Sequence, residues 1–225
     1  MTTSDLFDHP VVLFDLDGTI SDNSAGILAC LEHALAEMGH PVPDAATLRA
    51  TIGPPLRDAF AHCGVPEAQL DEAVERYRAR YHDTGWSEND PYPGVIELIG
   101  RLSASGRRVA TATSKPEFSA TMILDHFGVS PHLEAIGAAS LDASRTSKEA
   151  VVRHALDLLG ADAGEALIVG DRHHDVLGAR AAGVATSIGV RWGFAEPGEL
   201  ETAGATAIAT DADHLARLLG VSSQL

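Results

Sequence analysis

The stretch that decides the fold is Val11-Val12-Leu13-Phe14-Asp15-Leu16-Asp17-Gly18-Thr19, a short apolar run that ends in polar residues. Four consecutive apolar residues predict a buried strand, and Asp and Gly directly after them predict a turn. A turn needs no catalytic role, so this stretch alone leaves a structural and a catalytic interpretation open. The rest of the chain decides between them.

Similar apolar runs recur along the chain, and each is followed by residues with helical periodicity. Strands that alternate with helices predict an α/β fold, a Rossmann-like parallel sheet with helices on both faces. Ligands bind such sheets at the carboxyl ends of the strands. The further expected strands are residues 108–112, 133–136, 166–169, 184–188 and 205–209.

The alternation breaks between residues 24 and 90, where helical stretches follow one another with no strand between them. Ser24 is expected to cap the first helix, and residues 66–81 form another amphipathic run. The simplest interpretation is an α-helical cap domain inserted after the first strand, able to open and close over a site. The expected division is residues 1–21 and 92–225 for the core and 22–91 for the cap.

Composition excludes several classes of function. The 225 residues include 32 acidic and 16 basic side chains, a formal net charge of −16, so no basic surface for nucleic acid or anionic lipid is expected. No apolar run reaches the roughly 18 residues of a membrane span, and the first ten residues do not resemble a signal peptide. Cys30 and Cys63 give neither a metal-ligand spacing nor a disulfide framework. We expect a reduced, cytoplasmic protein with neither nucleic acid nor a membrane as its main partner.

Carboxylates gather where two of the expected strands end. Asp15 and Asp17 follow the first run, and Asp171, with Asp175 one helical turn later, follows the run at 166–169. Parallel strands open on the same edge of a sheet, so four carboxylates are expected in one crevice. Their mutual repulsion favours a bound cation. Mg²⁺ is the predicted cofactor, because it is the commonest hard cation beside phosphate substrates.

The only two lysines of the chain are both expected at helix N-termini. Lys115 follows a strand and precedes Pro116, and Lys148 follows Ser147 and begins a helix. A lysine near the positive end of a helix dipole is unfavourable unless an anion binds there, and helix N-termini bind phosphate. Solvated surface charges are the alternative interpretation. Thr113, at the end of the strand before Lys115, can cap a helix and bind phosphate at once.

The candidate site residues, taken in their order along the chain, resemble the motifs of a known family. Asp15-x-Asp17-Gly18-Thr19, Thr113, Lys148 and Gly170-Asp171-x-x-x-Asp175 match the four motifs of the haloacid dehalogenase superfamily. The helical insertion is similar to the small cap of the subgroup that includes phosphoglycolate phosphatase and β-phosphoglucomutase. Three stretches resemble a branch described as 5′-nucleotidase-like: Ile52-Gly53-Pro54-Pro55-Leu56, Ala112-Thr113-Ser114-Lys115-Pro116 and Gly170-Asp171-Arg172-His173-His174-Asp175.

The resemblance implies a Mg²⁺-dependent phosphatase of small phosphate monoesters. Asp15 would attack phosphorus and form an aspartyl-phosphate, and Asp17 would protonate the leaving oxygen and then activate water. Thr113 and Lys148 would hold the transferring phosphoryl group. The implied metal ligands are Asp15, the backbone carbonyl of Asp17, Asp171 and, through water, Asp175. The expected substrate contacts are Gly18, Thr19, Ser114, Lys115 and Arg57.

The alternatives are weighed on residues present or absent. A dehalogenase is disfavoured because its chemistry does not use the second aspartate, here Asp17. A phosphonatase needs a lysine in the cap, and residues 24–90 contain none. A β-phosphoglucomutase-like phosphomutase stays open because it uses the same core. The non-enzymatic alternative is a regulatory binding protein on the same fold.

Specificity is assigned to the cap. Lys148-Glu149-Ala150 stands where many phosphoglycolate phosphatase-like chains have Lys-Pro-x-Pro, which puts phosphoglycolate as the substrate in doubt. Arg57, Arg76 and Arg80 are candidate contacts for a second anionic group, with a solvated helix face as the alternative.

A pair of histidines and a pair of aromatic residues lie close to the expected site in the sequence. Adjacent histidines cannot both face one ion from a helix, so His173 and His174 are not expected to bind zinc, and one of them is a candidate partner of the nearby aspartates. Trp192 and Phe194 are expected to be packing residues or a rim of the site.

Overall fold

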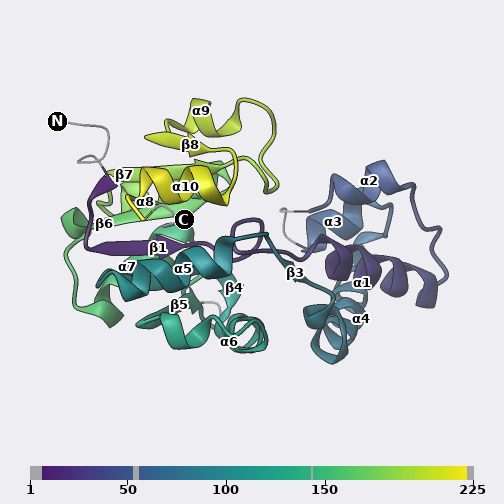
Figure 1. Ribbon diagram of the computed structural model, residues 1–225. Coiled ribbons are helices and arrows are strands. Elements are labelled where there is room, and N and C mark those ends of the chain that lie inside the picture. Colours follow the sequence, from purple (N-terminus) through teal and green to yellow (C-terminus); the bar gives the residue numbers. More distant parts are fainter. Residues whose placement is uncertain (1–6, 53–55, 143, 222–225) are drawn as a thin grey trace. The chain divides into compact units, whose positions relative to one another are not determined.

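The structure is a computed structural model that describes residues 7–52, 56–142 and 144–221 (Figure 1). The chain divides into two compact units, Met1–Ser21 with Pro91–Leu225, and Asp22–Asp90. The chain passes between the units at two short strands, β2 (Ser21–Asp22) and β3 (Asp90–Pro91), which pair with each other in a small sheet.

The first unit is built on a six-stranded sheet with the order β5-β4-β1-β6-β7-β8, in which every neighbouring pair is parallel. This confirms the predicted α/β fold. β1 lies in the interior of the sheet, and all four of its residues are buried. The strands are β1 (Val11–Phe14), β4 (Arg108–Pro116), β5 (Ala135–Ala139), β6 (Ala166–Gly170), β7 (Thr186–Val190) and β8 (Ala207–Ala209).

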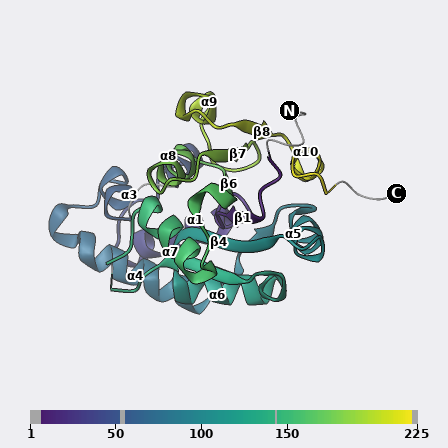
Figure 2. The ribbon, with the colours of Figure 1, turned by 90° about the vertical axis from the view of Figure 1, so that its left-hand side faces the viewer.

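Helices cover both faces of this sheet, as Figure 2 shows. α7 and α8 pack against β4 to β7 from one side, while α5 and α10, in contact with each other, lie on the opposite side. The helices of this unit are α5 (Val95–Ala104), α6 (Glu117–His126), α7 (Lys148–Leu159), α8 (His173–Ala181), α9 (Glu199–Ala203) and α10 (Ala212–Leu218), with the 3₁₀ turns η4 (Ser130–His132) and η5 (Ala163–Glu165).

Helix α7 shows how the sequence builds this unit. Its N-cap is Ser147, whose hydroxyl accepts a 3.2 Å hydrogen bond from the Ala150 amide, and it ends at Gly160, whose φ of 59° suits glycine. Apolar residues recur on one helix face between these ends and are buried against the sheet. They are Val151, Val152, Ala155, Leu156 and Leu159.

Several strands begin later than the sequence predicts, because the preceding helix or turn uses the first residues. β7 begins at Thr186 because the Val184 amide still bonds the Ala179 carbonyl of α8. β8 begins at Ala207 because the Ala205 amide bonds the Leu200 carbonyl of α9. β5 likewise begins two residues late, after η4.

The second unit is helical, as expected, and has its own apolar core, in which Leu31, Phe60 and Tyr77 are buried. The expected capping role of Ser24 is wrong. Ser24 is the first residue of α1, and it does not cap the helix. Its own backbone amide donates a 2.9 Å hydrogen bond to Asp22 Oδ1. The elements are α1 (Ser24–Glu37), α2 (Ala45–Arg49), α3 (Leu56–His62), α4 (Leu70–Asp83) and the 3₁₀ turns η2 (Glu67–Gln69) and η3 (Gly85–Ser87).

One of the stretches that carry the family resemblance and the question of a membrane span remain to be described. Gly53, Pro54 and Pro55, part of one stretch with 5′-nucleotidase-like resemblance, lie outside the described residues. Among the helices that the structure describes, none combines the length and the apolar character needed to cross a bilayer.

Candidate active site

The site begins where two neighbouring strands end. Asp15 directly follows β1, and its amide continues the sheet by bonding the Val169 carbonyl of β6 at 2.9 Å. Asp171 directly follows β6. Because β1 and β6 are parallel neighbours, both aspartates emerge at the carboxyl edge of the sheet.

A third carboxylate, Asp175, joins them from the first turn of α8. Asp15, Asp171 and Asp175 each offer a ligand oxygen within 4.8 Å of the others, and their exposed fractions are 8%, 0% and 2%. Gly170 permits this approach, since a Cβ there would lie 2.3 Å from Asp175 Cγ. The Arg172 amide donates to Asp175 Oδ2 at 2.9 Å and orients that carboxylate. We call these three residues the aspartate group.

Lys148 supplies a positive charge to the aspartate group. Its ammonium Nζ lies 2.8 Å from Asp15 Oδ1 and 2.7 Å from Asp175 Oδ1, and it donates to the Ala112 carbonyl at 3.0 Å. It is the first residue of α7, as predicted, and its side chain is 8% exposed. The two carboxylates raise the pKa of Lys148 above its ordinary value despite burial, so it stays charged.

One ammonium does not balance three buried carboxylates. Burial, followed by the Asp175 and Asp15 charges, raises the pKa of Asp171 well above its ordinary value. Burial also raises the pKa of Asp15, although Lys148 acts in the opposite direction. These directions indicate negative charge that the protein leaves uncompensated. An all-oxygen donor set of this kind suits a hard divalent cation such as Mg²⁺.

Asp17 is not one of the three carboxylates whose ligand oxygens lie within 4.8 Å of one another. Its carboxylate lies 2.7 and 3.0 Å from the ammonium of Lys115, whose side chain is 7% exposed. Lys115 thus has a carboxylate partner at a position where the sequence suggested a phosphate.

The end of β4 also differs from expectation. The strand runs through Ser114 and Lys115 to Pro116, with a register irregularity between Thr113 and Pro116, and α6 begins only at Glu117. Lys115 therefore precedes the helix by two residues and is not at its N-terminus. Thr113 is 1% exposed and its hydroxyl accepts from the Lys115 amide at 3.1 Å, while Ser114 is exposed.

The turn after Asp15 packs tightly against Asp171. Gly18 has a φ of 81°, and a Cβ there would lie 2.2 Å from Asp171 Oδ2, so only glycine suits this position. The Thr19 hydroxyl points to Asp171 Oδ1 at 3.4 Å, a long contact, and Thr19 is 1% exposed. We call residues 15–19 the acidic turn, and Gly18 and Thr19 hold this turn against Asp171.

Sequence reasoning missed two contacts from the segment after β7. The Phe194 amide donates to Asp171 Oδ2 at 2.7 Å, and the Trp192 indole Nε1 donates to the Thr19 carbonyl at 3.1 Å. Both residues were expected to be packing residues or a rim of the site, and neither expectation specified these hydrogen bonds. A backbone amide carries no residue-type signal, so no pattern could have indicated the first contact.

The paired histidines have a different partner from the one expected. His173 Nδ1 lies 2.6 Å from Glu199 Oε1, which also accepts from the His173 amide and from Arg172 Nε, each at 2.8 Å. These donors lower the pKa of Glu199 to about 2 despite its burial. Within the described residues, neither histidine bonds to Asp171 or Asp175. Glu199 instead ties α9 to the start of α8.

The three candidate arginines of the cap are each held by carboxylates of the second unit. Arg57 pairs with Asp71 and, at 2.7 Å, with Glu67. Arg76 pairs with Glu37 and Glu72, and Arg80 pairs with Glu88 and also contacts Cys30 Sγ. These pairs satisfy the guanidinium groups within the second unit, and a contact of Arg57, Arg76 or Arg80 with substrate stays a prediction.

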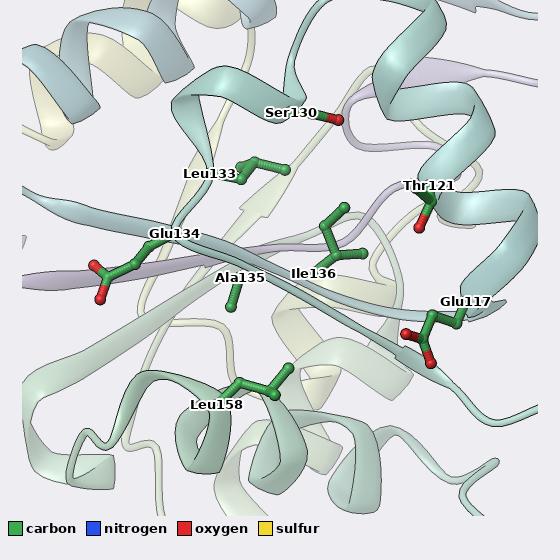
Figure 3. A pocket seen from close by; sticks show the side chains of 8 residues that line it. All are labelled: Glu117, Thr121, Ser130, Leu133, Glu134, Ala135, Ile136 and Leu158. Atoms are coloured by element: carbon green, nitrogen blue, oxygen red, sulfur yellow. The ribbon is translucent and has the colours of Figure 1, made fainter.

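A separate pocket of about 450 Å³ lies beside the edge strand β5, between α6, η4 and α7 (Figure 3). Ile136 and Leu158 give it apolar walls, and Glu117 and Glu134 lie at its ends. None of the predicted site residues lines it, so the chemistry is sought at the aspartate group. The remaining lining residues are Thr121, Ser130, Leu133 and Ala135.

Known proteins that are similar to this chain include hydrolases of one family. The sequence model of the haloacid dehalogenase-like hydrolase family matches residues 12–189. A protein of Pseudomonas aeruginosa named 5′-nucleotidase is 45% identical over 193 residues, 85% of this chain and 87% of that protein. A Mycobacterium tuberculosis protein named tyrosine-protein kinase PtkA is 40% identical over 213 residues, 94% of this chain and 72% of its own length. The solved structure of a haloacid dehalogenase-like family hydrolase of Streptococcus pneumoniae is 32% identical, with a TM-score of 0.86 over 96% of this chain and 99% of that one.

Proposed function

The chain belongs to the haloacid dehalogenase-like hydrolase family as an enzyme of phosphatase type, and on that premise we propose that it hydrolyses small phosphate monoesters through an aspartyl-phosphate on Asp15. The observation that carries the proposal is the buried aspartate group with Lys148 bound to two of its members, Asp15 and Asp175. Buried, undercompensated carboxylates beside a lysine are typical of active sites, where preorganised charge acts on the reacting groups.

Asp15 is the proposed nucleophile. One of its oxygens is held by Lys148, which offsets the negative charge that would otherwise repel a phosphate dianion. The other carboxylate oxygen attacks phosphorus in line with the leaving oxygen, the P–O bond to the alcohol breaks, and water later cleaves the acyl phosphate and regenerates Asp15.

Asp17 is the proposed acid and base. It would protonate the leaving alkoxide in the first step and accept a proton from the attacking water in the second. Its carboxylate is 30% exposed, so it can exchange protons with solvent, and Lys115 holds it in one orientation. We propose that the Thr113 hydroxyl and Lys148 steady the equatorial oxygens of the transferring group.

Asp15, Asp171 and the backbone carbonyl of Asp17 are the proposed direct ligands of Mg²⁺, with Asp175 bonding through water. Bound there, the ion would neutralise charge on the phosphate as it is transferred. The three buried carboxylates supply the hard oxygen donors that this ion prefers.

Removal of divalent ions is expected to abolish activity. Hydrolysis of p-nitrophenyl phosphate is measured after dialysis against EDTA, with Mg²⁺ or Ca²⁺ then added back. We expect full recovery with Mg²⁺ only, because octahedral coordination by single carboxylate oxygens suits the smaller ion. Turnover that persists in EDTA would contradict the metal-dependent mechanism.

Nucleoside 5′-monophosphates are the proposed substrate class. The 45% identical relative named 5′-nucleotidase supports it, whereas a relative named phosphoglycolate phosphatase is 33% identical. Glu149-Ala150 after Lys148 also departs from the pattern of many phosphoglycolate phosphatase-like chains.

A substrate panel tests this choice by release of inorganic phosphate from nucleoside monophosphates, phosphoglycolate and sugar phosphates. We expect the highest kcat/KM for a nucleoside 5′-monophosphate. Conversion of β-glucose 1-phosphate mainly into glucose 6-phosphate would instead favour the phosphomutase. The 40% identity to a protein named tyrosine-protein kinase adds one arm, in which labelled phosphate transferred from ATP to tyrosine would favour a kinase.

A further inference from the structure

We infer that the segment Trp192-Gly193-Phe194 is a positioning element that makes Asp171 offer a single carboxylate oxygen to the cation and so favours Mg²⁺ over Ca²⁺. The inference rests on the proposed metal site. The segment follows β7, two strands away from β1 in the sheet, and it reaches back across the end of β6 to the acidic turn.

The contacts of the two Asp171 oxygens are unequal. Oδ2 accepts the Phe194 amide at 2.7 Å and is enclosed by two glycines, because a Cβ would lie 2.2 Å away if built on Gly18 and 2.5 Å away if built on Gly193. Among the described residues, the hydrogen-bond partner of Oδ1 is the Thr19 hydroxyl, at a long 3.4 Å. Oδ2 is therefore closely packed and already accepts a strong hydrogen bond, and we assign the ion to Oδ1, the oxygen with the weaker contact.

The segment also clamps the acidic turn to Asp171. The Trp192 indole donates to the Thr19 carbonyl at 3.1 Å, and the ring of Trp192 packs on Tyr92 with centroids 6.2 Å apart. Gly193 lies so close that a Cβ would be 2.3 Å from the Gly18 carbonyl oxygen and 2.4 Å from Asp171 Cβ. Trp192 and Gly193 thus keep the turn and the carboxylate in one arrangement.

A single available oxygen has a consequence for the choice of ion. Ca²⁺ takes six to eight ligands and often binds a carboxylate through both oxygens, whereas Mg²⁺ takes six at short, near-octahedral distances. With Oδ2 accepting the Phe194 amide in close contact with Gly18 and Gly193, bidentate binding by Asp171 would require that oxygen to use its second lone pair in a tightly packed place. Groups that orient a ligand in this way commonly change metal affinity about 10- to 100-fold when they are removed.

The test measures binding of Mg²⁺ and of Ca²⁺ alone to the full chain, by isothermal titration calorimetry without substrate. Gly193→Ala places a methyl group against Gly18 and Asp171, and Trp192→Phe removes the indole donor but keeps an aromatic ring. Gly164→Ala is the matched control, since nothing lies within 4 Å of its added Cβ. Circular dichroism verifies that each variant is folded.

We expect Gly193→Ala to weaken Mg²⁺ binding by about 10-fold or more and Ca²⁺ binding much less, so that the preference for Mg²⁺ narrows. Trp192→Phe should also weaken Mg²⁺ binding more than Ca²⁺ binding, by a smaller factor than Gly193→Ala, and Gly164→Ala should change neither affinity. Unchanged Mg²⁺ affinity in both folded variants, or an equal loss for both ions, would overturn the inference while leaving the proposed function intact. Failure of the wild-type chain to bind Mg²⁺ would overturn the proposed metal site and this inference together.

Discussion

Asp15→Asn is expected to lower kcat for p-nitrophenyl phosphate by on the order of 10³-fold or more, because removal of a nucleophile leaves only binding and electrostatic effects. The amide has nearly the shape of the carboxylate but cannot form an acyl phosphate. Steady-state phosphate release, together with a search for labelled enzyme after rapid acid quenching, measures both the rate and the intermediate.

The same variant should be at least as stable as the wild type without metal. Burial raises the pKa of Asp15 even though Lys148 lies 2.8 Å away, so the ionised carboxylate costs stability at neutral pH. Asparagine removes that charge. We expect an unchanged or higher melting temperature in EDTA, and a clear fall would show that the activity was lost through unfolding.

Asp17→Asn is the matched control, since it makes the same chemical change two residues along the chain. We expect a smaller loss than for Asp15→Asn with p-nitrophenyl phosphate, because p-nitrophenolate leaves without a proton. The loss should be larger with an alkyl phosphate, whose alkoxide needs a general acid. Activity of Asp15→Asn within 10-fold of the wild type would contradict the assignment of the nucleophile.

The sequence predicted the parts of the site that follow from topology. Apolar runs followed by Asp15 and by Asp171 predict strands with aspartates at their ends, and parallel pairing of β1 with β6 then brings these side chains to one edge. Lys148 was predictable in the same way, because Ser147 marks a helix start. In each case a local pattern decided the position.

Contacts between distant segments were not predictable. The pair Lys115–Asp17 joins residues 98 positions apart, and the contact of the Phe194 amide with Asp171 uses a backbone group that every residue type except proline carries. His173 likewise meets Glu199, 26 positions away. No periodicity encodes such pairs, so these contacts of Lys115, His173 and Phe194 could be found only in the structure.

Lys148→Met is expected to have the second large effect, on both activity and stability. Without its ammonium, no cation among the described residues contacts both Asp15 and Asp175. We expect kcat/KM for p-nitrophenyl phosphate to fall by on the order of 100-fold or more, as for other groups that stabilise transferring charge. Loss of one partner of a buried ion pair should cost about 3 kcal/mol of unfolding free energy at pH 8 in EDTA.

The loss of stability should depend on pH with a definite sign. The pKa values of Asp15 and Asp171 are already raised in the folded protein, and removal of Lys148 raises them further. A carboxyl group with a raised folded pKa favours the fold below its unfolded pKa and loses that contribution as pH rises through the folded value. The free energy of unfolding is measured with urea in EDTA. The amount by which it is lower in Lys148→Met than in the wild type should therefore be smaller at pH 5 than at pH 8.

Lys115→Met separates this effect from the loss of any buried lysine. The two lysine side chains are similarly buried, 7% and 8% exposed, but Lys115 pairs with Asp17, whose side chain is 30% exposed, whereas Lys148 pairs with the buried Asp15 and Asp175. We expect it to cost less than about 1 kcal/mol, as for other partly exposed ion pairs, with little change between pH 5 and pH 8. If Lys148→Met and Lys115→Met lost the same unfolding free energy at pH 5 and at pH 8, each loss would reflect only the packing of the lysine stem. That result would contradict the undercompensated negative charge at the aspartate group.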